Sequence, residues 1–464
     1  MIFVMRKILL KKFSTVFLLT AFFSAVYPYA IFSADATAAE KDKVRILTIS
    51  QGIELLLKNS RLIKVALPDN EMALQNSLAA RSALLPQMNI FADKTFNQHP
   101  PAVKFGAQAV ETGDRNPLTY GLDVYQTLFD FGKSLANYRA AKELTKAVTA
   151  NTESIKRIAT LEFIVSFFNI LETEETIIVF EKEAESLTSY LSDVGHLYEQ
   201  GVAVKNDLLP AKVRLADVKQ RLIAARNDQE LAVARLNNIL ALPLREKTLV
   251  QDISLQPPKL PEIEAAWETA KIQRPEIVFY SEQIKASSLT ERAKAVENFP
   301  VFFADAGFAY QQNKYVTHEN NGSLELGAKF KFYDGGAARA ELLKERARQK
   351  QLKEEKDKLI EDIKFEIEDS FYGLKNASEK ISVAKEALEQ AEENVRFYRT
   401  KYNAGSATTT DVLEAITMQT KAQMNYCSDD YELKRGYAKL LYSMGMDLGL
   451  IYEKMESKNG GINE

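Results

Sequence analysis

The sequence contains little of what enzymes use for chemistry. Its 464 residues include one cysteine, Cys427, and only three histidines. A single cysteine excludes an internal disulfide, and we interpret Cys427 as a residue that packs inside a helical region. The three histidines, His99, His196 and His318, are scattered and form no metal-ligand pattern. Since a Gly-rich phosphate loop is also missing, the sequence predicts no catalytic residue, no metal and no cofactor.

Strong net charge and long apolar runs are scarce as well. The formal net charge is -3, so the chain has no overall basic field that would indicate nucleic-acid binding. After Ala39 no segment approaches the roughly 20 apolar residues of a membrane-spanning helix. Any insertion of the remaining chain into a membrane must therefore use strands.

The beginning of the chain has the order of a secretory signal. Four basic residues between positions 6 and 12 precede an apolar stretch at 13–32, and small residues follow at 34–38. We predict a signal peptide at residues 1–38, and an uncleaved membrane anchor is the alternative. No cysteine is available near this site for lipid attachment, so we expect no lipid anchor at the N-terminus.

The rest of the chain contains two copies of one plan, detected as self-similarity at a fixed offset. Residues 128–241 align without a gap with residues 332–445, an offset of 204 residues. We predict a first repeat at 39–250, a second at 251–450 and a C-terminal tail at 451–464. The identical residues stand where elements begin or end, and they include the pairs Asp130 and Asp334, Gly132 and Gly336, Tyr198 and Tyr402, Gly201 and Gly405, and Asp207 and Asp411.

Each copy contains two segments in which apolar and polar residues alternate, as is typical of a β-strand. They lie at about 87–97 and 119–129 in the first copy and at about 301–311 and 323–333 in the second. The upstream parts match at an offset of about 214, so the loop in the first copy is about ten residues longer. Around ten residues is the length of a tilted membrane strand, although a soluble sheet would show the same alternation.

A long helix and a returning helix follow the strands in each copy. Residues 133–200 and 337–403 are rich in helix formers and contain no proline, so each can form a helix of roughly 100 Å. Gly201 and Gly405 are placed to end these helices. A packed seam is predicted on each helix by a 4-4-3 spacing of apolar residues, at Ala159, Phe163, Phe167 and Ile170 and at Ile363, Ile367, Phe371 and Leu374.

Four strands cannot close a barrel, and open strand edges are not tolerated in lipid. A membrane barrel must therefore be shared between chains. Three copies would supply twelve strands and would gather the long helices into a second tube. Two or four copies would satisfy closure as well.

The strand-to-helix junctions at 128–132 and 332–336 resemble the aromatic-Asp-Gly-Gly signature of the TolC-like outer-membrane efflux proteins, the outer membrane factor family. Residues 84–86 resemble the family's strand entry. The resemblance runs from about 47 to 449. It departs at Phe131, where the family usually has a second glycine, and a further departure is Thr127, where a proline is common.

The two turns at Tyr198 and Tyr402 resemble the family's periplasmic tips, because each has the pattern Tyr-x-x-Gly with Asp six residues after the glycine. In the family these tips dock onto an adaptor protein. The resemblance therefore implies tip turns and adaptor docking at Gly201, Val202, Gly405 and Ser406.

The resemblance implies an α+β membrane protein. Four membrane β-strands per chain would contribute to a shared 12-stranded trimeric β-barrel, continued by a long α-helical coiled-coil tunnel in the periplasm, with an equatorial belt around 242–261. The homotrimer would lie in the cell outer membrane as the passive exit duct of a tripartite efflux or type I secretion system. Its partners would be a periplasmic adaptor, an inner-membrane transporter and outer-membrane lipid. A periplasmic coiled-coil scaffold without a pore is the alternative.

The resemblance also implies a gate at the periplasmic end. An acidic ring is expected at Asp411 and Glu414, which share one face of a helix because they are three residues apart. A capping box at the same two residues is the competing interpretation. Asp207 and Tyr402 match positions that link the family's closed tips, but Ala407 stands where the family has an arginine. Asp207 as a plain N-cap is the alternative for that residue.

Overall fold

The computed structural model describes residues 45–201, 204–253 and 261–460. The predicted signal peptide and Val202 lie outside these ranges. Within them no helix is both long and apolar enough to cross a membrane.

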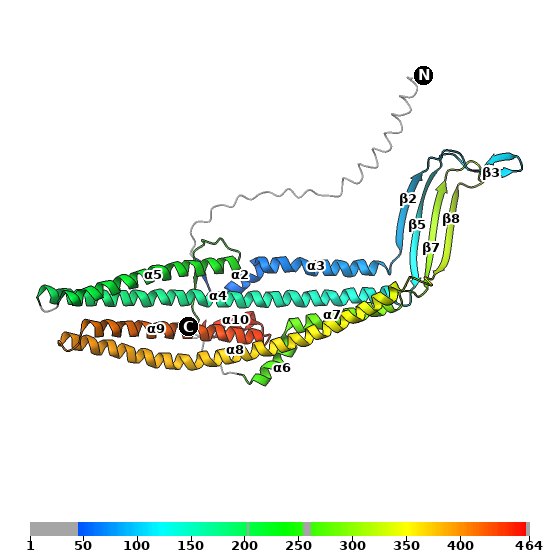
Figure 1. Cartoon of the computed structure of the whole chain (residues 1–464). Coiled ribbons are helices and arrows are strands. Elements are labelled where there is room, and N and C mark those ends of the chain that lie inside the picture. Colours follow the sequence, from blue (N-terminus) through cyan, green and yellow to red (C-terminus); the bar gives the residue numbers. More distant parts are fainter. Residues whose placement is uncertain (1–44, 202–203, 254–260, 461–464) are drawn as a thin grey trace, which may run out of the picture. The chain divides into compact units, whose positions relative to one another are not determined.

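The first part of the described chain contains the first long helix and the strands before it (Figure 1). Its elements are β1 (Arg45–Leu47), α2 (Ile49–Asn59), α3 (Arg61–Ser82), β2 (Gln87–Lys94), β3 (Ala102–Phe105), β4 (Gln108–Glu111), β5 (Leu118–Phe129), α4 (Lys133–Glu199) and α5 (Lys205–Ile239).

Among the described residues, the second part has a similar order of elements around its own long helix, without a counterpart of β3 and β4 and with one more helix at its end. Its elements are β6 (Thr248–Val250), α6 (Ile263–Gln273), α7 (Pro275–Ala295), β7 (Val301–Gln311), β8 (Asn320–Lys329), α8 (Ala337–Asn403), α9 (Thr409–Ser443) and α10 (Leu448–Gly460). The two long helices, α4 and α8, each have 67 residues, and the two returning helices, α5 and α9, each have 35.

The long helices begin at the signature aspartates. Asp130 accepts hydrogen bonds from the N–H groups of Gly132 (3.1 Å) and Ser134 (2.8 Å). Asp334 accepts them in the same way from Gly336 (2.9 Å) and Ala338 (2.8 Å). Each carboxylate therefore binds N–H groups that the first turn of the helix leaves free, which explains why an acid stands at these junctions.

Backbone conformation at the junctions is left-handed. Gly335 has a φ of 72°, and the matching residue of the first copy, Phe131, has a φ of 56°. A non-glycine residue in this conformation carries strain of about 1–2 kcal/mol. Packing of the Phe131 ring against Phe129 (4.8 Å between centroids) and Phe299 (5.0 Å) offsets that strain.

The four long strands form one antiparallel sheet in the order β2-β5-β7-β8. The central pair joins the two halves of the chain, because β5 pairs with β7, for example Leu122 with Phe308. Among the described residues, β2 and β8 are each paired on one side only. The sheet therefore ends in two free edges.

Three strands lie close to their expected ranges, and the fourth differs. We expected residues 323–333, but β8 runs from Asn320 to Lys329. Lys329 pairs with Val301, the first residue of β7 after Pro300, so the following residues have no strand to pair with. Phe330 and Phe332, which continue the alternation in the sequence, lie beyond the strand.

The core forms around α4. This helix packs mainly against α3, α5, α7 and α9, and the predicted seam from Ala159 to Ile170 is buried. The matching seam on α8 is confirmed as well, since Ile363, Ile367 and Leu374 are buried and Phe371 packs against them. Cys427 on α9 is buried, which confirms that it is a packing residue.

The chain ends also contribute to the core. β1 pairs in parallel with β6, the short strand that follows α5. The segment expected as a C-terminal tail contains most of α10, whose Tyr452 is fully buried and lies 6.5 Å from Phe168. The Glu456 carboxylate accepts a hydrogen bond from the Ser50 N–H at the start of α2 (3.2 Å).

A buried arginine joins α7, α8 and α9, and no pattern in the sequence indicated it. The Arg274 guanidinium contacts Glu276 at 3.1 Å and Glu366 at 3.0 Å. It also donates to the Tyr442 carbonyl at 3.3 Å. Two carboxylates and a carbonyl thus compensate a cation that would otherwise be costly to bury.

Candidate functional site at the hairpin tips and the sheet

Both hairpin tips are built on a left-handed glycine. Gly201 has a φ of 73° after α4, and Gly405 has a φ of 71° after α8. At the second tip the Gly405 N–H donates to the Tyr402 carbonyl (2.9 Å) and the Ser406 N–H to the Lys401 carbonyl (2.8 Å). This pair of bonds is a Schellman motif, in which glycine has the lowest steric cost.

The returning helix α9 begins with a capping box that lies one turn before the predicted pair, Asp411 and Glu414. Asp411 is not the N-cap residue. The N-cap is Thr408, whose hydroxyl accepts from the Asp411 N–H at 3.3 Å, while the Asp411 carboxylate accepts from the Thr408 N–H at 2.7 Å. The sequence pattern Thr408-x-x-Asp411 is typical of this capping box. The prediction of a capping box between Asp411 and Glu414 is therefore wrong.

The capping box affects the charge of Asp411. Hydrogen bonds from the Thr408 backbone N–H and from its hydroxyl hold the pKa of Asp411 below its usual range. Asp411 is therefore an anion at neutral pH. Glu414 lies one turn further along α9 and is exposed, on the side of the helix opposite the buried Ile416. Asp411 thus takes part in the capping box, whereas the exposed Glu414 does not.

In the first tip, Asp207 is the third residue of α5 rather than its N-cap. Its carboxylate accepts from the Val204 N–H at 3.1 Å. Among the described residues no hydrogen bond joins Asp207 to Tyr402. The plain N-cap interpretation of Asp207 is wrong in position, although the carboxylate does bind a backbone N–H at the helix start.

Tyr402 links the second tip to the first long helix. Its ring packs edge-on against Tyr190 of α4, with 5.3 Å between centroids, and its hydroxyl accepts from Thr409 at 3.5 Å. Tyr190 is buried, and this burial raises the pKa of its hydroxyl. The tips of the two hairpins therefore share one apolar cluster, which also contains Leu187, Ala211 and Val412.

Further polar contacts tie the hairpins together above the tips. The Arg399 guanidinium on α8 donates to the Ser186 hydroxyl on α4 at 2.5 Å. One turn before Ser186 on α4, the buried Glu183 carboxylate contacts Arg214 at 3.4 Å and Arg221 at 3.2 Å. No pattern in the sequence indicates these residues, because a charged side chain on a long helix is usually solvated, and only the packing shows which ones are enclosed.

The sheet has two chemically different faces, as the register shows. One face is apolar and consists of Met88, Ile90, Leu122, Val124, Ala306, Phe308, Leu324 and Leu326. The other face carries polar groups and includes Asn89, Asp123, Tyr125, Asp305, Ser323, Glu325 and Lys329. Leu326 on the apolar face is 71 % exposed, so the described chain leaves this face uncovered.

This combination of sheet and long helices matches solved structures of bacterial outer-membrane channels. The outer membrane protein VceC of Vibrio cholerae has a TM-score of 0.76 and 16 % identity, with 86 % of this chain and 96 % of that chain covered. The CmeC outer membrane channel of Campylobacter jejuni has a TM-score of 0.75 and 16 % identity, with 89 % of each chain covered. The fold is therefore that of the outer-membrane channels.

The sequence agrees with this class. A family model described as outer membrane efflux protein matches residues 52–242 and 268–446, which is more than half of the chain. The chain belongs to the outer membrane efflux protein family, as its TolC-like motifs predicted. Outer membrane protein TolC of Escherichia coli (strain K12) is 20 % identical over 396 residues, which cover 81 % of this chain and 77 % of TolC.

Proposed function

We propose that the chain forms a homotrimeric channel in the cell outer membrane. The channel is the passive exit duct of a tripartite efflux or type I secretion system. The four-stranded sheet is the observation that carries this proposal, because it has one apolar face, one polar face and two free edges. In lipid, the backbone N–H and C=O groups at the two edges of such a sheet can be hydrogen-bonded only if strands of neighbouring copies pair with them.

Three copies close the sheet into a barrel of twelve strands, with β8 of one copy beside β2 of the next. The apolar face then meets lipid, and the polar face lines the lumen. Asp305 and Glu325 support this orientation, because they stand directly opposite each other on the polar face. Two like charges in such a pair are tolerated where water screens them.

The helices continue the barrel as a periplasmic tunnel. The equal lengths of α4 and α8 and of α5 and α9 support an internal twofold repeat, at 39–250 and 251–450. In the trimer six hairpins surround one passage. The chain needs no energy source of its own, because an inner-membrane transporter drives the substrate and a periplasmic adaptor joins the two. The adaptor docks at the tips, at Gly201, Val202, Gly405 and Ser406.

The gate lies at the same end. Asp411 and Glu414 from three copies form a ring of carboxylates, which favours cations at the constriction. Tyr402 and Asp207 belong to the groups that hold the tips together. The contact between Tyr402 and Tyr190 supports this role, since it joins the two hairpins of one chain. Ala407 offers no charge for a link to Asp207, so apolar contacts carry more of the closure.

Fractionation and electrical recording test the proposal. We expect the mature protein in the outer-membrane fraction, as a trimer on native gels in mild detergent, and we expect cation-preferring channels in planar bilayers. The second candidate is a periplasmic scaffold without a pore. The long helices alone would suit it, but it leaves the exposed apolar face unexplained. A soluble periplasmic monomer would reject the channel and favour the scaffold.

A further inference from the structure

The longer loop of the first copy forms a small hairpin of its own. Strands β3 and β4 pair antiparallel, with Val103 opposite Val110 and Phe105 opposite Gln108. Between Phe105 and Gln108 lies a two-residue turn whose first residue, Gly106, has a φ of 63°. The matching loop between β7 and β8 spans residues 312–319 and contains no described strand. The hairpin is therefore a feature of the first copy alone.

The base of the hairpin is fastened to that second loop. Thr112 donates its N–H to the Pro101 carbonyl (2.8 Å) and accepts at its own carbonyl from the Asn313 side chain (3.3 Å). The Lys314 N–H donates to the Asp114 carboxylate (3.2 Å). These bonds hold the hairpin above the loop that joins β7 and β8, and in Figure 1 the hairpin extends past the end of β8.

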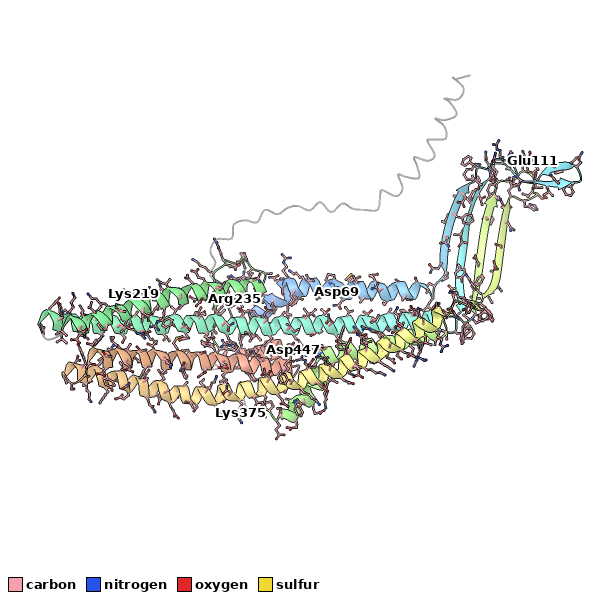
Figure 2. The ribbon with its side chains drawn as sticks, in the orientation of Figure 1. Asp69, Glu111, Lys219, Arg235, Lys375 and Asp447 are labelled. Atoms are coloured by element: carbon pink, nitrogen blue, oxygen red, sulfur yellow. The ribbon has the colours of Figure 1, made fainter. Side chains whose placement is uncertain are left out.

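The two faces of the hairpin differ in what they contact. The carboxylate of Glu111 accepts a hydrogen bond from the Tyr315 hydroxyl, so the face of Glu111, Lys104 and Ala102 is the one bonded to the chain's own loop. Figure 2 labels Glu111 where the hairpin joins the sheet. Because side chains alternate along a strand, Val103, Phe105 and Val110 lie on the opposite face.

That opposite face is apolar apart from Gln108, and it is uncovered in the single chain. Phe105 is 69 % exposed, Val103 49 % and Val110 46 %. A two-stranded hairpin is only marginally stable in water without a hydrophobic face packed against something else. The bonds at the base fix its position but cover none of these three side chains.

We propose that this apolar face docks on the next copy of the chain in the trimer and clasps the outer rim of the barrel. The inference rests on the proposed trimer and adds an interface outside the strands. Its occupant is a second copy because the hairpin is bonded to the loop between β7 and β8 and extends past the end of β8, a free edge that faces β2 of the next copy in the proposed barrel. Phe96, two residues after β2, is 78 % exposed at that other edge. Closing the barrel brings the hairpin's Phe105 and the neighbour's Phe96 to the same junction.

Interchain cross-linking tests the clasp. In a Cys427→Ser background, Phe105→Cys and Phe96→Cys are combined in the full chain, and intact trimers in outer membranes are treated with an oxidant or a short bis-maleimide. We expect covalent dimers and trimers on denaturing gels, and none from either single variant. The matched control combines Lys104→Cys, on the bonded face, with Phe96→Cys, and we expect its yield to be several-fold lower.

A second measurement does not depend on the geometry of one cross-link. We expect Val103→Ser with Val110→Ser to lower the temperature at which the trimer dissociates in detergent, and Ala102→Ser with Ala109→Ser to leave it unchanged. Trimers without cross-links and without this shift overturn the clasp but leave the channel standing. If a fluorophore on Phe105→Cys in such trimers is quenched by brominated lipid, the face lies in the membrane instead. Absence of trimers from the parent chain rejects the proposed function itself, and the clasp with it.

Discussion

The two long helices have the same length and the same place in their repeats, yet they bury different amounts of their surface. α4 has nineteen buried residues, and α8 has seven. The difference follows from their neighbours, since α4 is packed by helices of both repeats, whereas α8 packs mainly against α6, α7 and α9. Apolar side chains remain exposed on α8, at Leu343, Phe365, Tyr372, Val383 and Phe397.

This comparison shows that equal sequence patterns need not produce equal burial within one chain. A helix of 67 residues needs partners along its whole length. For α4 the chain supplies more of them, and its exposed apolar residues, such as Leu144 at 45 %, are less exposed than Phe365 of α8 at 75 %. For α8 the uncovered apolar residues favour partners from outside the chain, as the proposed trimer provides.

The largest expected effect contrasts the seams of the two helices. Phe167 on α4 is fully buried, and its counterpart Phe371 on α8 is half-buried. We expect Phe167→Ala to lower the free energy of unfolding by about 3–5 kcal/mol and Phe371→Ala by about 1–2 kcal/mol. Unfolding in urea, followed by circular dichroism, measures both. Equal losses would mean that α8 is as central to the core as α4.

The next effect compares the strands, where the two copies are expected to behave alike. Leu122 on β5 and Leu326 on β8 occupy matching places on the apolar face. We expect Leu122→Arg and Leu326→Arg each to oppose membrane insertion by about 2–4 kcal/mol near the bilayer midplane. The readout is the fraction recovered as folded protein in the outer membrane. Lys329→Gln on the polar face is the control and should be tolerated, and equal tolerance of all three variants would mean that these strands do not meet lipid.

A smaller change in stability is expected at the two junctions between strand and helix, at Phe131 and Gly335. Phe131→Ala removes the ring but keeps the left-handed strain, whereas Phe131→Gly removes both. We expect Phe131→Gly to be the more stable of the two by about 1–2 kcal/mol, although glycine normally weakens a chain relative to alanine. Gly335→Ala, in the second copy, should cost about the same amount. Thermal unfolding of the three variants measures this, and a less stable Phe131→Gly would contradict it.

The smallest effect on stability is expected at the tips. Asp411→Asn with Glu414→Gln should leave the trimer folded, because the asparagine side-chain oxygen can still accept the hydrogen bond from the Thr408 N–H in the capping box. The double variant should nevertheless weaken the cation preference in single-channel recordings. Asp207→Asn in the first tip is the matched control and should change selectivity less. Unchanged selectivity in the double variant would leave Asp411 as a helix cap only.

Acidification gives an independent test of Asp411. Its pKa is lowered in the folded chain by the Thr408 N–H, so its ionised form is stabilised. The resulting stability is present above the ordinary aspartate value of 3.8 and is lost as the pH falls through the lower folded value. We therefore expect the contribution of Asp411 to selectivity to persist at pH 5. A loss of its contribution above pH 5 would mean that repulsion between the carboxylates of the ring raises the pKa of Asp411 more than the Thr408 hydrogen bonds lower it.

Local features of the fold were predictable because their causes are local. The ends of α4 and α8 follow from Asp130 and Asp334, which bind the first N–H groups, and from Gly201 and Gly405, which adopt the left-handed conformation. At the candidate gate, the sequence placed Asp411 at the start of a helix. It did not distinguish Thr408 from Asp411 as the N-cap, since both residue types favour that position.

The sequence by itself determined the length and ends of the two long helices and the presence of four alternating strands, because periodicity and capping depend on neighbouring residues. The tertiary structure alone decided that β5 pairs with β7, that α4 is central, and that the extra loop folds into β3 and β4. It also decided the burial of Arg274 among two carboxylates. These features depend on contacts between residues far apart in the chain. A periodic pattern predicts that a helix or strand has an apolar face, but it does not predict which other apolar face will pack against it.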